Sequence, residues 1–248
     1  MAGVEVYGSS NERSILLLHG AGSSRLMWLP QLQRLSDEFR AVSIDLPGHG
    51  VRRMERFDID DAAAVARQAL NKHAGGDAVV VGLSGGGYVA IALADLANEQ
   101  VKGLVLSGAS ASYRGLGGFS TKMYGSVVQV IAKRMEGKGE SSMRKLLPSE
   151  LADEILAEPL SMRGAVDSLR RIPGRDYYGM AARYPGPILL LNGERDKVNR
   201  KEEAALAAAS GAKIEMVANA GHACSLTQPE AFSEAVRRFA REAWASSR

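Results

Sequence analysis

The amino-acid sequence predicts an α/β fold, with a mostly parallel central sheet flanked by helices. Short apolar runs suited to strands alternate along the chain with helical patterns. The runs are continuously apolar, which is typical of strands covered on both faces, as in a parallel sheet. With 248 residues, of which 46% are hydrophobic and 24% charged, the chain has the length and composition of a single α/β domain with an insertion.

The predicted elements follow one another in a β-α order. Strands are predicted at residues 14–18, 41–44, 78–81, 101–106, 187–191 and 213–217, and helices at about 60–72, 86–98, 201–209 and 229–244. For the last helix, Thr227 is the predicted cap, Pro229 suits the first turn and Glu230 completes a capping box.

Regular periodicity breaks between residues 110 and 180. Glycines and prolines separate short helical pieces there, such as 149–157; they are Gly115, Gly117, Gly118, Pro148, Pro159 and Pro173. We therefore expect an α/β core formed by residues 1–109 and 181–248, and a small helical cap formed by residues 110–180.

Composition excludes several classes of protein. The net charge is only +3 and basic residues are interleaved with acids, so a nucleic-acid partner is not expected. No apolar run is long enough to span a membrane, and the amino terminus lacks the pattern of a secretory signal. The single cysteine, Cys224, is compatible with a reducing compartment, so a cytoplasmic location is expected. The sequence does not indicate an oligomeric state.

A glycine-rich motif, Gly82-Leu83-Ser84-Gly85-Gly86, follows the third predicted strand and precedes a helix. A nucleophile on a sharp strand-to-helix turn, or nucleophile elbow, requires small residues two positions to either side. The helix amino terminus favours negative charge developing at Ser84, and the Gly85 N–H is a natural oxyanion donor. The alternatives are a plain glycine-rich turn and a phosphate-binding loop of the dinucleotide type, but the dinucleotide type follows the first strand, whereas this motif lies in mid-chain.

Two histidine-containing motifs follow the first two predicted strands. The first is His19-Gly20-Ala21-Gly22, where an early loop can place a second backbone N–H opposite the nucleophile, and Ala21 is the predicted donor. We interpret His19 itself as a core histidine. The second, at residues 45–50, predicts a tight turn in which Asp45 and His49 have structural roles.

The remaining polar candidates lie near the carboxyl terminus. Asp196 follows the strand predicted at 187–191, and His222 follows the strand predicted at 213–217. Because the carboxyl ends of parallel strands share one edge of a sheet, Ser84, Asp196 and His222 can converge although they are far apart in sequence. Glu194 is the main alternative to Asp196 as the acid.

These motifs together resemble the α/β-hydrolase superfamily, from about residue 13 to residue 244. The matching segments are HGAG at 19–22, DLPGHG at 45–50, GLSGG at 82–86, NGERD at 192–196 and GH at 221–222. The resemblance implies a catalytic triad of Ser84, Asp196 and His222, in the chain order usual for this fold. Many relatives have His directly before the nucleophile and Met or Gln directly after it. Here Leu83 and Gly85 occupy those positions, and the glycine leaves an open space that would alter substrate fit.

The implied mechanism is nucleophilic catalysis without a metal or organic cofactor. His222 removes the Ser84 proton during attack on an acyl carbonyl, Ala21 and Gly85 stabilise the oxyanion, and Asp196 orients the imidazole. The favoured reaction is hydrolysis of a carboxylic ester or thioester of a small molecule, as in a carboxylesterase. The superfamily hosts many reactions on one scaffold, so the substrate stays open.

Two alternatives use the same triad. One is a carbon–carbon bond hydrolase or lyase, in which a cap arginine would hold a carboxylate; the candidates are Arg163, Arg170, Arg171 and Arg175. The other is a binding or signalling protein that turns over very slowly. The segment 110–180 also holds the whole +3 charge excess, with 11 basic and 8 acidic residues. That excess fits a solvated face better than an anionic substrate.

Several apolar side chains have two interpretations. Those of the predicted cap are equally suited to lining a pocket and to packing the cap on the sheet; they are Met123, Tyr124, Met135, Met143, Met162, Tyr177, Tyr178 and Met180. Leu26 and Trp28 are expected in the core, and Cys224 is expected to be a buried apolar residue that lines the site.

Overall fold

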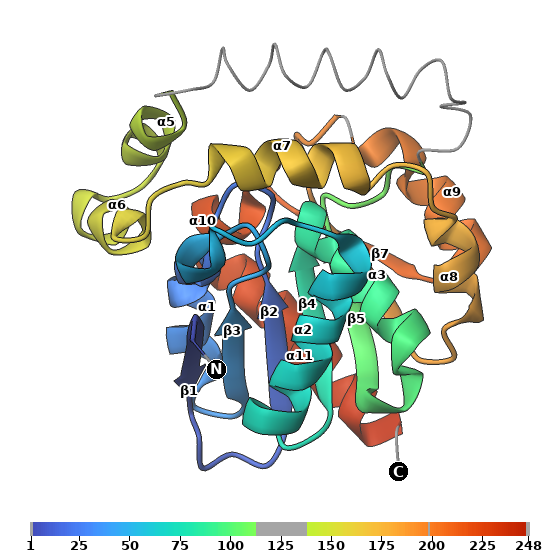
Figure 1. Ribbon diagram of the computed structural model, residues 1–248. Helices are drawn as coiled ribbons and strands as arrows, with labels where there is room; N and C mark the ends of the chain where they lie inside the picture. Colours follow the sequence, from blue (N-terminus) through green and yellow to red (C-terminus); the bar gives the residue numbers. More distant parts are fainter. Residues whose placement is uncertain (1, 113–137, 198, 247–248) are drawn as a thin grey trace.

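A seven-stranded sheet crosses the centre of the computed structural model, which describes residues 2–112, 138–197 and 199–246 (Figure 1). The strands are β1 (Val4–Tyr7), β2 (Ser14–Leu18), β3 (Arg40–Ile44), β4 (Ala78–Leu83), β5 (Val101–Ser107), β6 (Ile188–Gly193) and β7 (Lys213–Val217). Their order is β1-β3-β2-β4-β5-β6-β7, with β1 antiparallel to β3 and all other neighbours parallel. This confirms the predicted α/β fold class.

Six strands lie where the sequence predicts them, with ends that differ by two residues at most. β1 was not predicted, and its sequence explains why. It is a four-residue edge strand whose residues are all partly or fully exposed, so it lacks the continuous apolar run that marks the buried strands.

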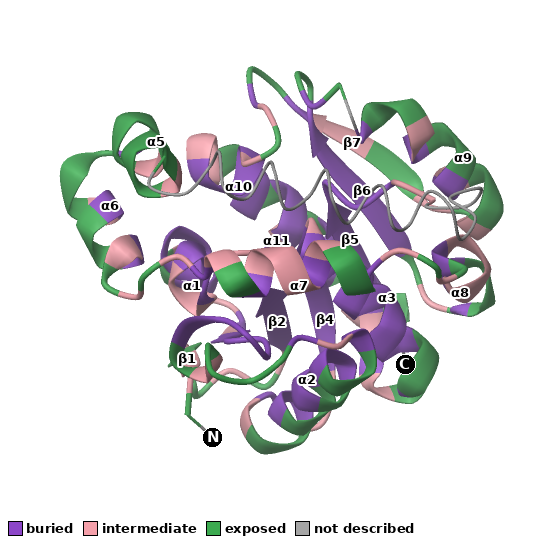
Figure 2. Ribbon diagram, turned by 45° about the horizontal axis from the view of Figure 1, so that its top comes forward, coloured by how far each residue is buried: buried purple, intermediate pink, exposed green. Residues whose placement is uncertain are grey.

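The sheet has a hydrophobic core on each face, and successive residues of a strand contribute to opposite cores. In β2, Leu16 and Leu18 join the core that contains residues of α2, α3 and α8, whereas Ile15 and Leu17 join the core under α1 and α11. These helices are α1 (Leu29–Leu35), α2 (Ile59–His73), α3 (Gly85–Leu96), α8 (Tyr177–Arg183) and α11 (Pro229–Ser246). Figure 2 shows the strands buried between helices whose outer faces are exposed.

The remaining elements are short or lie at the edges of the sheet. They are α9 (Arg200–Ser210), α10 (Cys224–Thr227) and three 3₁₀ turns, η1 (Arg25–Trp28), η2 (Gly50–Arg52) and η3 (Asn98–Gln100). All four predicted helices are present as α2, α3, α9 and α11. The capping box predicted for α11 is wrong: Thr227 ends α10, and its hydroxyl donates to the Ala223 carbonyl. Pro229 does begin α11, because its fixed φ suits a first helical residue.

Between β5 and β6 the chain leaves the sheet and forms helices beyond its carboxyl edge. α5 (Lys138–Leu146) and α6 (Ser149–Leu156) lie to one side, and α7 (Met162–Arg171) crosses above the strand ends (Figure 1). The predicted division into a core (1–109 and 181–248) and a cap (110–180) stays a prediction, since residues 113–137, with Gly115, Gly117 and Gly118, lie outside the described residues. α8, assigned to the cap by its sequence position, shares the core of α3.

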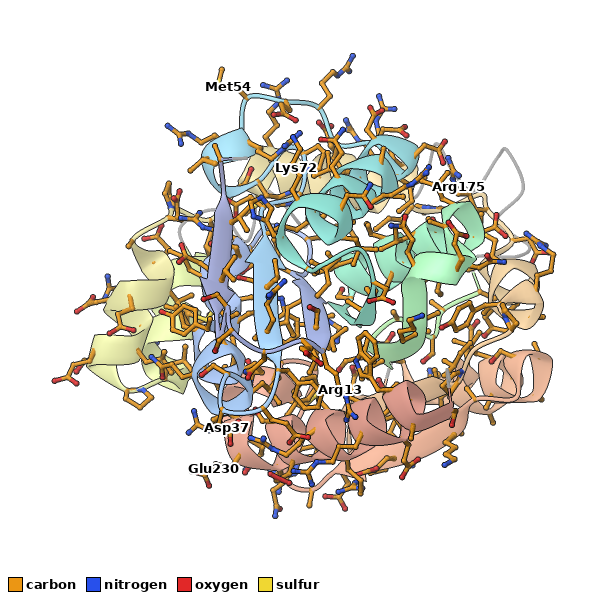
Figure 3. The ribbon with its side chains drawn as sticks, turned by 90° about the horizontal axis from the view of Figure 1, so that it is seen from below. Arg13, Asp37, Met54, Lys72, Arg175 and Glu230 are labelled. Carbon is orange, nitrogen blue, oxygen red and sulfur yellow. The ribbon has the colours of Figure 1, made fainter. Side chains whose placement is uncertain are left out.

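Charged side chains cover the outer helices. Viewed from below, Asp37 and Glu230 lie at the surface near α11 (Figure 3). Arg237 of α11 donates to Asp37 at 2.8 Å and to Glu38 at 3.2 Å. These contacts connect α11 to the turn after α1 and so support the two helices that cover one face of the sheet.

Candidate active site

The turn between β4 and α3 holds Ser84 at the carboxyl edge of the sheet. Its backbone angles, φ 52° and ψ −117°, are unusual for a residue with a side chain and cost about 1–3 kcal/mol. Its N–H donates to the Ser107 carbonyl on the neighbouring strand at 2.7 Å. The sequence motif therefore forms the strained strand-to-helix turn that it predicts.

Two glycines make this turn sterically feasible. A Cβ at Gly86 would come 2.6 Å from the carbonyl oxygen of His19 and even closer to that of Leu18. A Cβ at Gly82 would meet the carbonyl carbon of Gly86 at 2.5 Å. Both clashes involve backbone atoms, which cannot move aside cheaply. The prediction that small residues are required two positions to either side of Ser84 is confirmed.

Asp196 and His222 meet at the same edge of the sheet. The His222 Nδ1 and the Asp196 Oδ2 are 2.8 Å apart, and because an ionised carboxylate only accepts, the imidazole donates. The Asp196 side chain is 5% exposed, whereas that of His222 is 49% exposed. Burial works to raise the pKa of Asp196, but hydrogen bonds from His222 and Asn199, with the attraction of His222, outweigh it and hold the pKa below its usual value.

Glu194, the alternative acid, is used elsewhere. Its Oε2 accepts the N–H of Asn219 at 3.0 Å and so holds the turn after β7. Asn219 has a positive φ of 58°, which this hydrogen bond helps to maintain. The structure therefore brings Asp196 to His222 and leaves Glu194 in a structural contact.

Gly108 connects the position of Ser84 to that of His222. It follows Ser107, the residue whose carbonyl accepts the Ser84 N–H, and a Cβ placed on Gly108 would lie 2.5 Å from Cε1 of His222. The imidazole thus packs on Gly108, directly beside the strained turn. Among the described residues no hydrogen bond joins Ser84 to His222; catalytic hydrogen bonds of this kind are often long in resting enzymes and tighten with substrate.

The two predicted oxyanion donors are neighbours. A Cβ on Gly85 would lie 3.2 Å from the backbone nitrogen of Ala21. Neither of these N–H groups donates to another residue in the parts of the chain that the structure describes. The Ala21 loop is held from the far side, because the Gly22 N–H donates to His49 Nε2 and the Gly22 carbonyl accepts from the Ser161 N–H, each at 2.9 Å.

His19 and His49 have the structural roles that the sequence predicts. His19 Nε2 accepts from the Leu46 N–H at 3.1 Å, and His49 Nδ1 contacts the Pro47 carbonyl at 2.9 Å. Burial lowers the pKa of His19 to about 4. Burial, with the neighbouring His19, lowers the pKa of His49 to about 3. Both rings are therefore neutral at pH 7 and join the Ala21 loop to the turn after β3.

Asp45 is also structural, and its partner was not predicted. The buried carboxylate accepts from Arg25 twice, at 2.8 Å from the backbone N–H and at 2.7 Å from Nη1. Arg25 also pairs with Glu5 of β1 and with Glu158, each at 3.1 Å. This ion-pair cluster connects the edge strand, the loop after β2 and the segment after α6.

Cys224 and Trp28 are buried, as predicted, and Leu26 is partly buried against the same core. The Cys224 Sγ lies 3.3 Å from Oγ of Ser107, the residue bonded to the Ser84 N–H. Burial raises the pKa of the Cys224 thiol, so it is a weak nucleophile.

Two of the arginines proposed to hold a substrate carboxylate are already paired. Arg175 makes two hydrogen bonds to Asp60, at 2.8 and 2.7 Å, and Figure 3 shows Arg175 at the surface. Arg171 pairs with Asp58 at 3.2 Å. Arg163 and Arg170 are exposed on α7.

Four of the apolar residues predicted for the cap pack against the hydrophobic cores of the sheet. Tyr177 is buried, and its ring packs on Tyr88 with centroids 4.7 Å apart. Tyr178 and Met180 pack against the same core, and Met143 packs against the other, so the packing interpretation is confirmed for these four. Met162 is partly buried on α7, and Met123, Tyr124 and Met135 lie outside the described residues.

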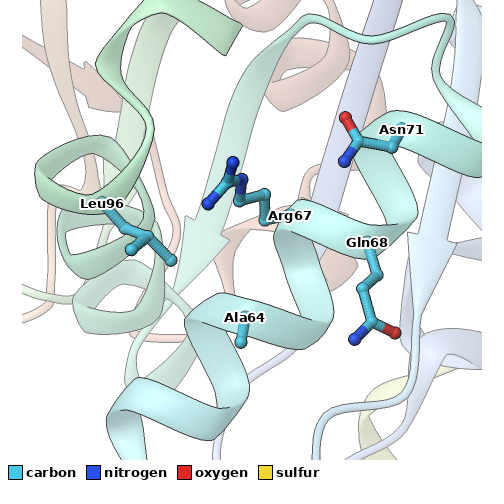
Figure 4. A pocket seen from close by; sticks show the side chains of 5 residues that line it. All are labelled: Ala64, Arg67, Gln68, Asn71 and Leu96. Carbon is cyan, nitrogen blue, oxygen red and sulfur yellow. The ribbon is translucent and has the colours of Figure 1, made fainter.

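The described residues also form a groove away from this edge of the sheet. A groove of about 360 Å³ lies between α2 and the end of α3, beside Ala64, Gln68 and Leu96 (Figure 4). Its polar residues Arg67 and Asn71 both hydrogen-bond Gln100. In the described ranges no three His, Cys, Asp or Glu side chains are grouped to hold a metal ion. Over those ranges no helix is both long and apolar enough to cross a membrane.

Asn199 is a site residue that the sequence motifs did not reveal. Its Nδ2 donates to Asp196 Oδ2 at 2.9 Å, the same oxygen that accepts from His222. The sequence did contain a signal for it. Asn199 is a short amide side chain just before the helix predicted at 201–209 and three residues after Asp196, and this spacing brings the two side chains together.

Comparison with known proteins places this chain in a wider group. Residues 15–235 match the model of the alpha/beta hydrolase family. A pimeloyl-[acyl-carrier protein] methyl ester esterase of Nitrosospira multiformis is 26% identical over 92% of this chain and 94% of its own length. The enzyme of the same name from Vibrio cholerae is 28% identical over 94% of this chain and 96% of its own length.

Solved structures show the same architecture. A thermophilic esterase from Thermogutta terrifontis superposes with a TM-score of 0.79 at 25% identity, covering 97% of this chain and 93% of its own. MenH from S. aureus also superposes with a TM-score of 0.79, at 19% identity and with 98% and 100% coverage, a likeness that shows the fold alone. Since the family model matches most of its length, the chain belongs to the alpha/beta hydrolase family.

Proposed function

We propose that this hydrolase cleaves a carboxylic ester or thioester through an acyl-enzyme. Ser84 is the nucleophile, His222 the general base and Asp196 the carboxylate that orients the imidazole. The observation that carries the proposal is the 2.8 Å hydrogen bond between Asp196 and His222. It lies beside a serine held in a strained strand-to-helix turn, the arrangement that serine hydrolases use on this fold.

Each group has a distinct role in the proposed reaction. Because Asp196 holds the Nδ1 proton, Nε2 of His222 is free to take the Ser84 proton as Oγ attacks the acyl carbonyl. The N–H groups of Ala21 and Gly85 stabilise the oxyanion. The imidazolium then donates its proton to the departing alcohol or thiol, which leaves an acyl-enzyme.

Water completes the cycle. His222 removes a proton from water as it attacks the acyl-enzyme, and then returns that proton to Ser84 Oγ when the acid leaves. None of these steps needs a redox partner, and the residues of the site account for every proton that moves.

The curated relatives are named for one ester, a methyl ester of a pimeloyl group on acyl carrier protein. We propose a small-molecule acyl ester as the substrate class, with methyl esters, free or carried on acyl carrier protein, tested first. A cytoplasmic location is part of the same proposal. Arg171 and Arg175, two of the four arginines offered for carboxylate binding in carbon–carbon cleavage, pair with Asp58 and Asp60 instead.

The decisive experiment compares Ser84→Ala with the wild type on a panel of methyl and chromogenic esters of increasing acyl length. Loss of the nucleophile should lower kcat by at least about a thousandfold with folding intact. Ser14→Ala is the matched control, because Ser14 is buried at the opposite end of β2 from the site. Near-normal turnover by Ser84→Ala would contradict the mechanism.

The same panel separates the alternatives. A carbon–carbon hydrolase would be slow on every ester, whereas labelling of Ser84 without product release would indicate a binding or signalling protein. Turnover that depends on acyl length, with a burst of the leaving group, is the result expected for an ester hydrolase.

A further inference from the structure

Asn199 occupies the amino-terminal cap position of α9, but its side chain does not cap that helix. An asparagine at this position normally accepts a hydrogen bond from an N–H of the first turn, and losing the cap costs about 1 kcal/mol. Instead, the buried amide turns back toward Asp196 and His222. A side chain that gives up its usual local contact is a sign that its orientation serves another purpose.

The amide and backbone of Asn199 hold both oxygens of the Asp196 carboxylate. Nδ2 donates to Oδ2 at 2.9 Å, and the Asn199 N–H donates to Oδ1 at 3.3 Å. Because His222 also donates to Oδ2, that oxygen receives two hydrogen bonds. The carboxylate is therefore held against rotation with one oxygen directed at the imidazole.

The position of the amide also bears on which histidine nitrogen carries the proton. Asn199 Nδ2 lies 3.3 Å from His222 Nδ1, and both are donors that converge on one carboxylate oxygen. If Asp196 rotated away, the amide would become the nearest group to Nδ1 and could donate to it. The proton would then move to Nε2, the nitrogen that must accept the Ser84 proton. A fixed carboxylate prevents this wrong tautomer.

Asn199 also joins the acid to the loop that supports the imidazole. Its Oδ1 accepts the Ser110 N–H at 3.4 Å, two residues beyond Gly108, on which the His222 ring packs. The loop has other anchors as well: the Tyr178 hydroxyl donates to the Ser110 carbonyl at 2.8 Å, and Glu202 accepts the Ser112 N–H at 2.7 Å. The loop should thus keep its shape without the Asn199 side chain.

Glu202 and Glu203, two acids of α9 that follow Asn199 in the chain, hydrogen-bond other residues. Glu202 binds the Ser112 N–H, and the buried Glu203 accepts from Asn192 at 2.9 Å and from Arg200 at 3.3 Å. Among the described residues, Asn199 and His222 supply every side-chain hydrogen bond to Asp196.

We propose that Asn199 is a positioning residue that holds the Asp196 carboxylate in register with His222 and keeps the general base in its active tautomer. The proposal rests on the proposed function, since it acts through that triad. A neutral amide suits this role, because it stabilises the carboxylate without a competing positive charge that would pair with Asp196 in place of His222.

The test compares Asn199→Ala and Asn199→Asp with the wild type in ester hydrolysis. Asp has the same shape and keeps the acceptor for Ser110, but it lacks the donor and adds a like charge beside Asp196. Both variants should lose about 10- to 100-fold in kcat with little change in KM, as expected when a supporting hydrogen bond to a catalytic group is removed. In Asn199→Asp the added negative charge favours the protonated form of the site, so the acidic limb of its kcat/KM profile should move to higher pH.

Asn71→Ala is the control, because Asn71 is an exposed amide at the far end of α2 that hydrogen-bonds Gln100. Thermal unfolding of each variant tests folding, and Asn199→Asp keeps the test valid if the alanine variant unfolds. Activity within twofold of the wild type, with superimposable pH profiles for both Asn199 variants, would overturn the proposal. If Ser84→Ala is inactive in the same assay, that outcome refutes only the role of Asn199; an active Ser84→Ala refutes the mechanism itself.

Discussion

Acid should destabilise this protein at a higher pH than its carboxylates alone would cause, because His19 and His49 are buried as neutral rings. Their pKa values are lowered to about 4 and about 3, from a value of 6.5 in an unfolded chain. As pH falls through 6.5, the unfolded chain takes up a proton on each ring while the folded protein does not. The stability contributed by the neutral rings is complete above pH 6.5 and is lost progressively toward pH 4 and 3.

The size of the effect follows from the proton difference. Each pH unit in that window removes about 1.4 kcal/mol per histidine once the unfolded ring is fully protonated. Between pH 7.5 and 5.5 this amounts to about 1 to 1.5 kcal/mol for each ring, and so to about 2 to 3 kcal/mol for the pair. Few aspartates and glutamates titrate in this range, so the histidines dominate the change.

Urea unfolding at pH 7.5, 6.5 and 5.5 measures this loss directly. His49→Gln removes one titrating ring while its amide oxygen can still accept from the Gly22 N–H, so the loss over the range should fall by about half. His73→Gln is the comparison: that ring is only partly buried on α2, and because burial also lowers its pKa, its removal should reduce the pH dependence, but by less than the removal of His49. A His49→Gln variant with the full wild-type pH dependence, or a wild type equally stable at pH 7.5 and 5.5, would refute the reasoning.

Three further substitutions test the site and its supports. Gly86→Ala should destabilise the fold by more than about 2 kcal/mol in urea unfolding, because its Cβ would collide with backbone carbonyls of β2 and the loop after it. Arg25→Met should cost about 3–5 kcal/mol in the same assay, since it leaves the buried carboxylate of Asp45 without its cation. Asp196→Asn should lower kcat by about a thousandfold or more, whereas Glu194→Gln should retain most of the activity in the same ester assay.

Matched controls make these outcomes specific. Gly221→Ala should barely change stability, because a Cβ there meets no atom within 4 Å. Arg241→Ala should change stability little, since its ion pair with Glu38 is exposed to solvent. If Gly86→Ala were as stable as Gly221→Ala, the steric account of the turn would fail. Equal losses for Glu194→Gln and Asp196→Asn would contradict the assignment of the acid.

Local patterns along the chain were enough to predict six strands of the sheet, the strained turn and the polar candidates. Runs such as 14–18 and 101–106 appear as strands at the predicted positions, because local patterning and burial favour the same structure there. The motif predicted both glycines around Ser84, for different reasons. Gly82 is required by the turn itself, since a Cβ there would meet the backbone of Gly86, whereas Gly86 is required by the backbone of β2 and the loop after it, which lie far away in the sequence. β1 was not predicted, because a short, half-exposed edge strand lacks the continuous apolar run that marks the buried strands.

Which side chains contact one another depends on the three-dimensional fold. The sequence left Glu194 open as an alternative to Asp196, and the fold turns one toward Asn219 and the other toward His222. It offered Arg175 for substrate, and the fold pairs it with Asp60. The contacts of Asn199 with Ser110 and His222 were hidden for the same physical reason. A hydrogen bond between groups on separate loops depends on how the strands are ordered in the sheet, and a pattern along the chain does not contain that order.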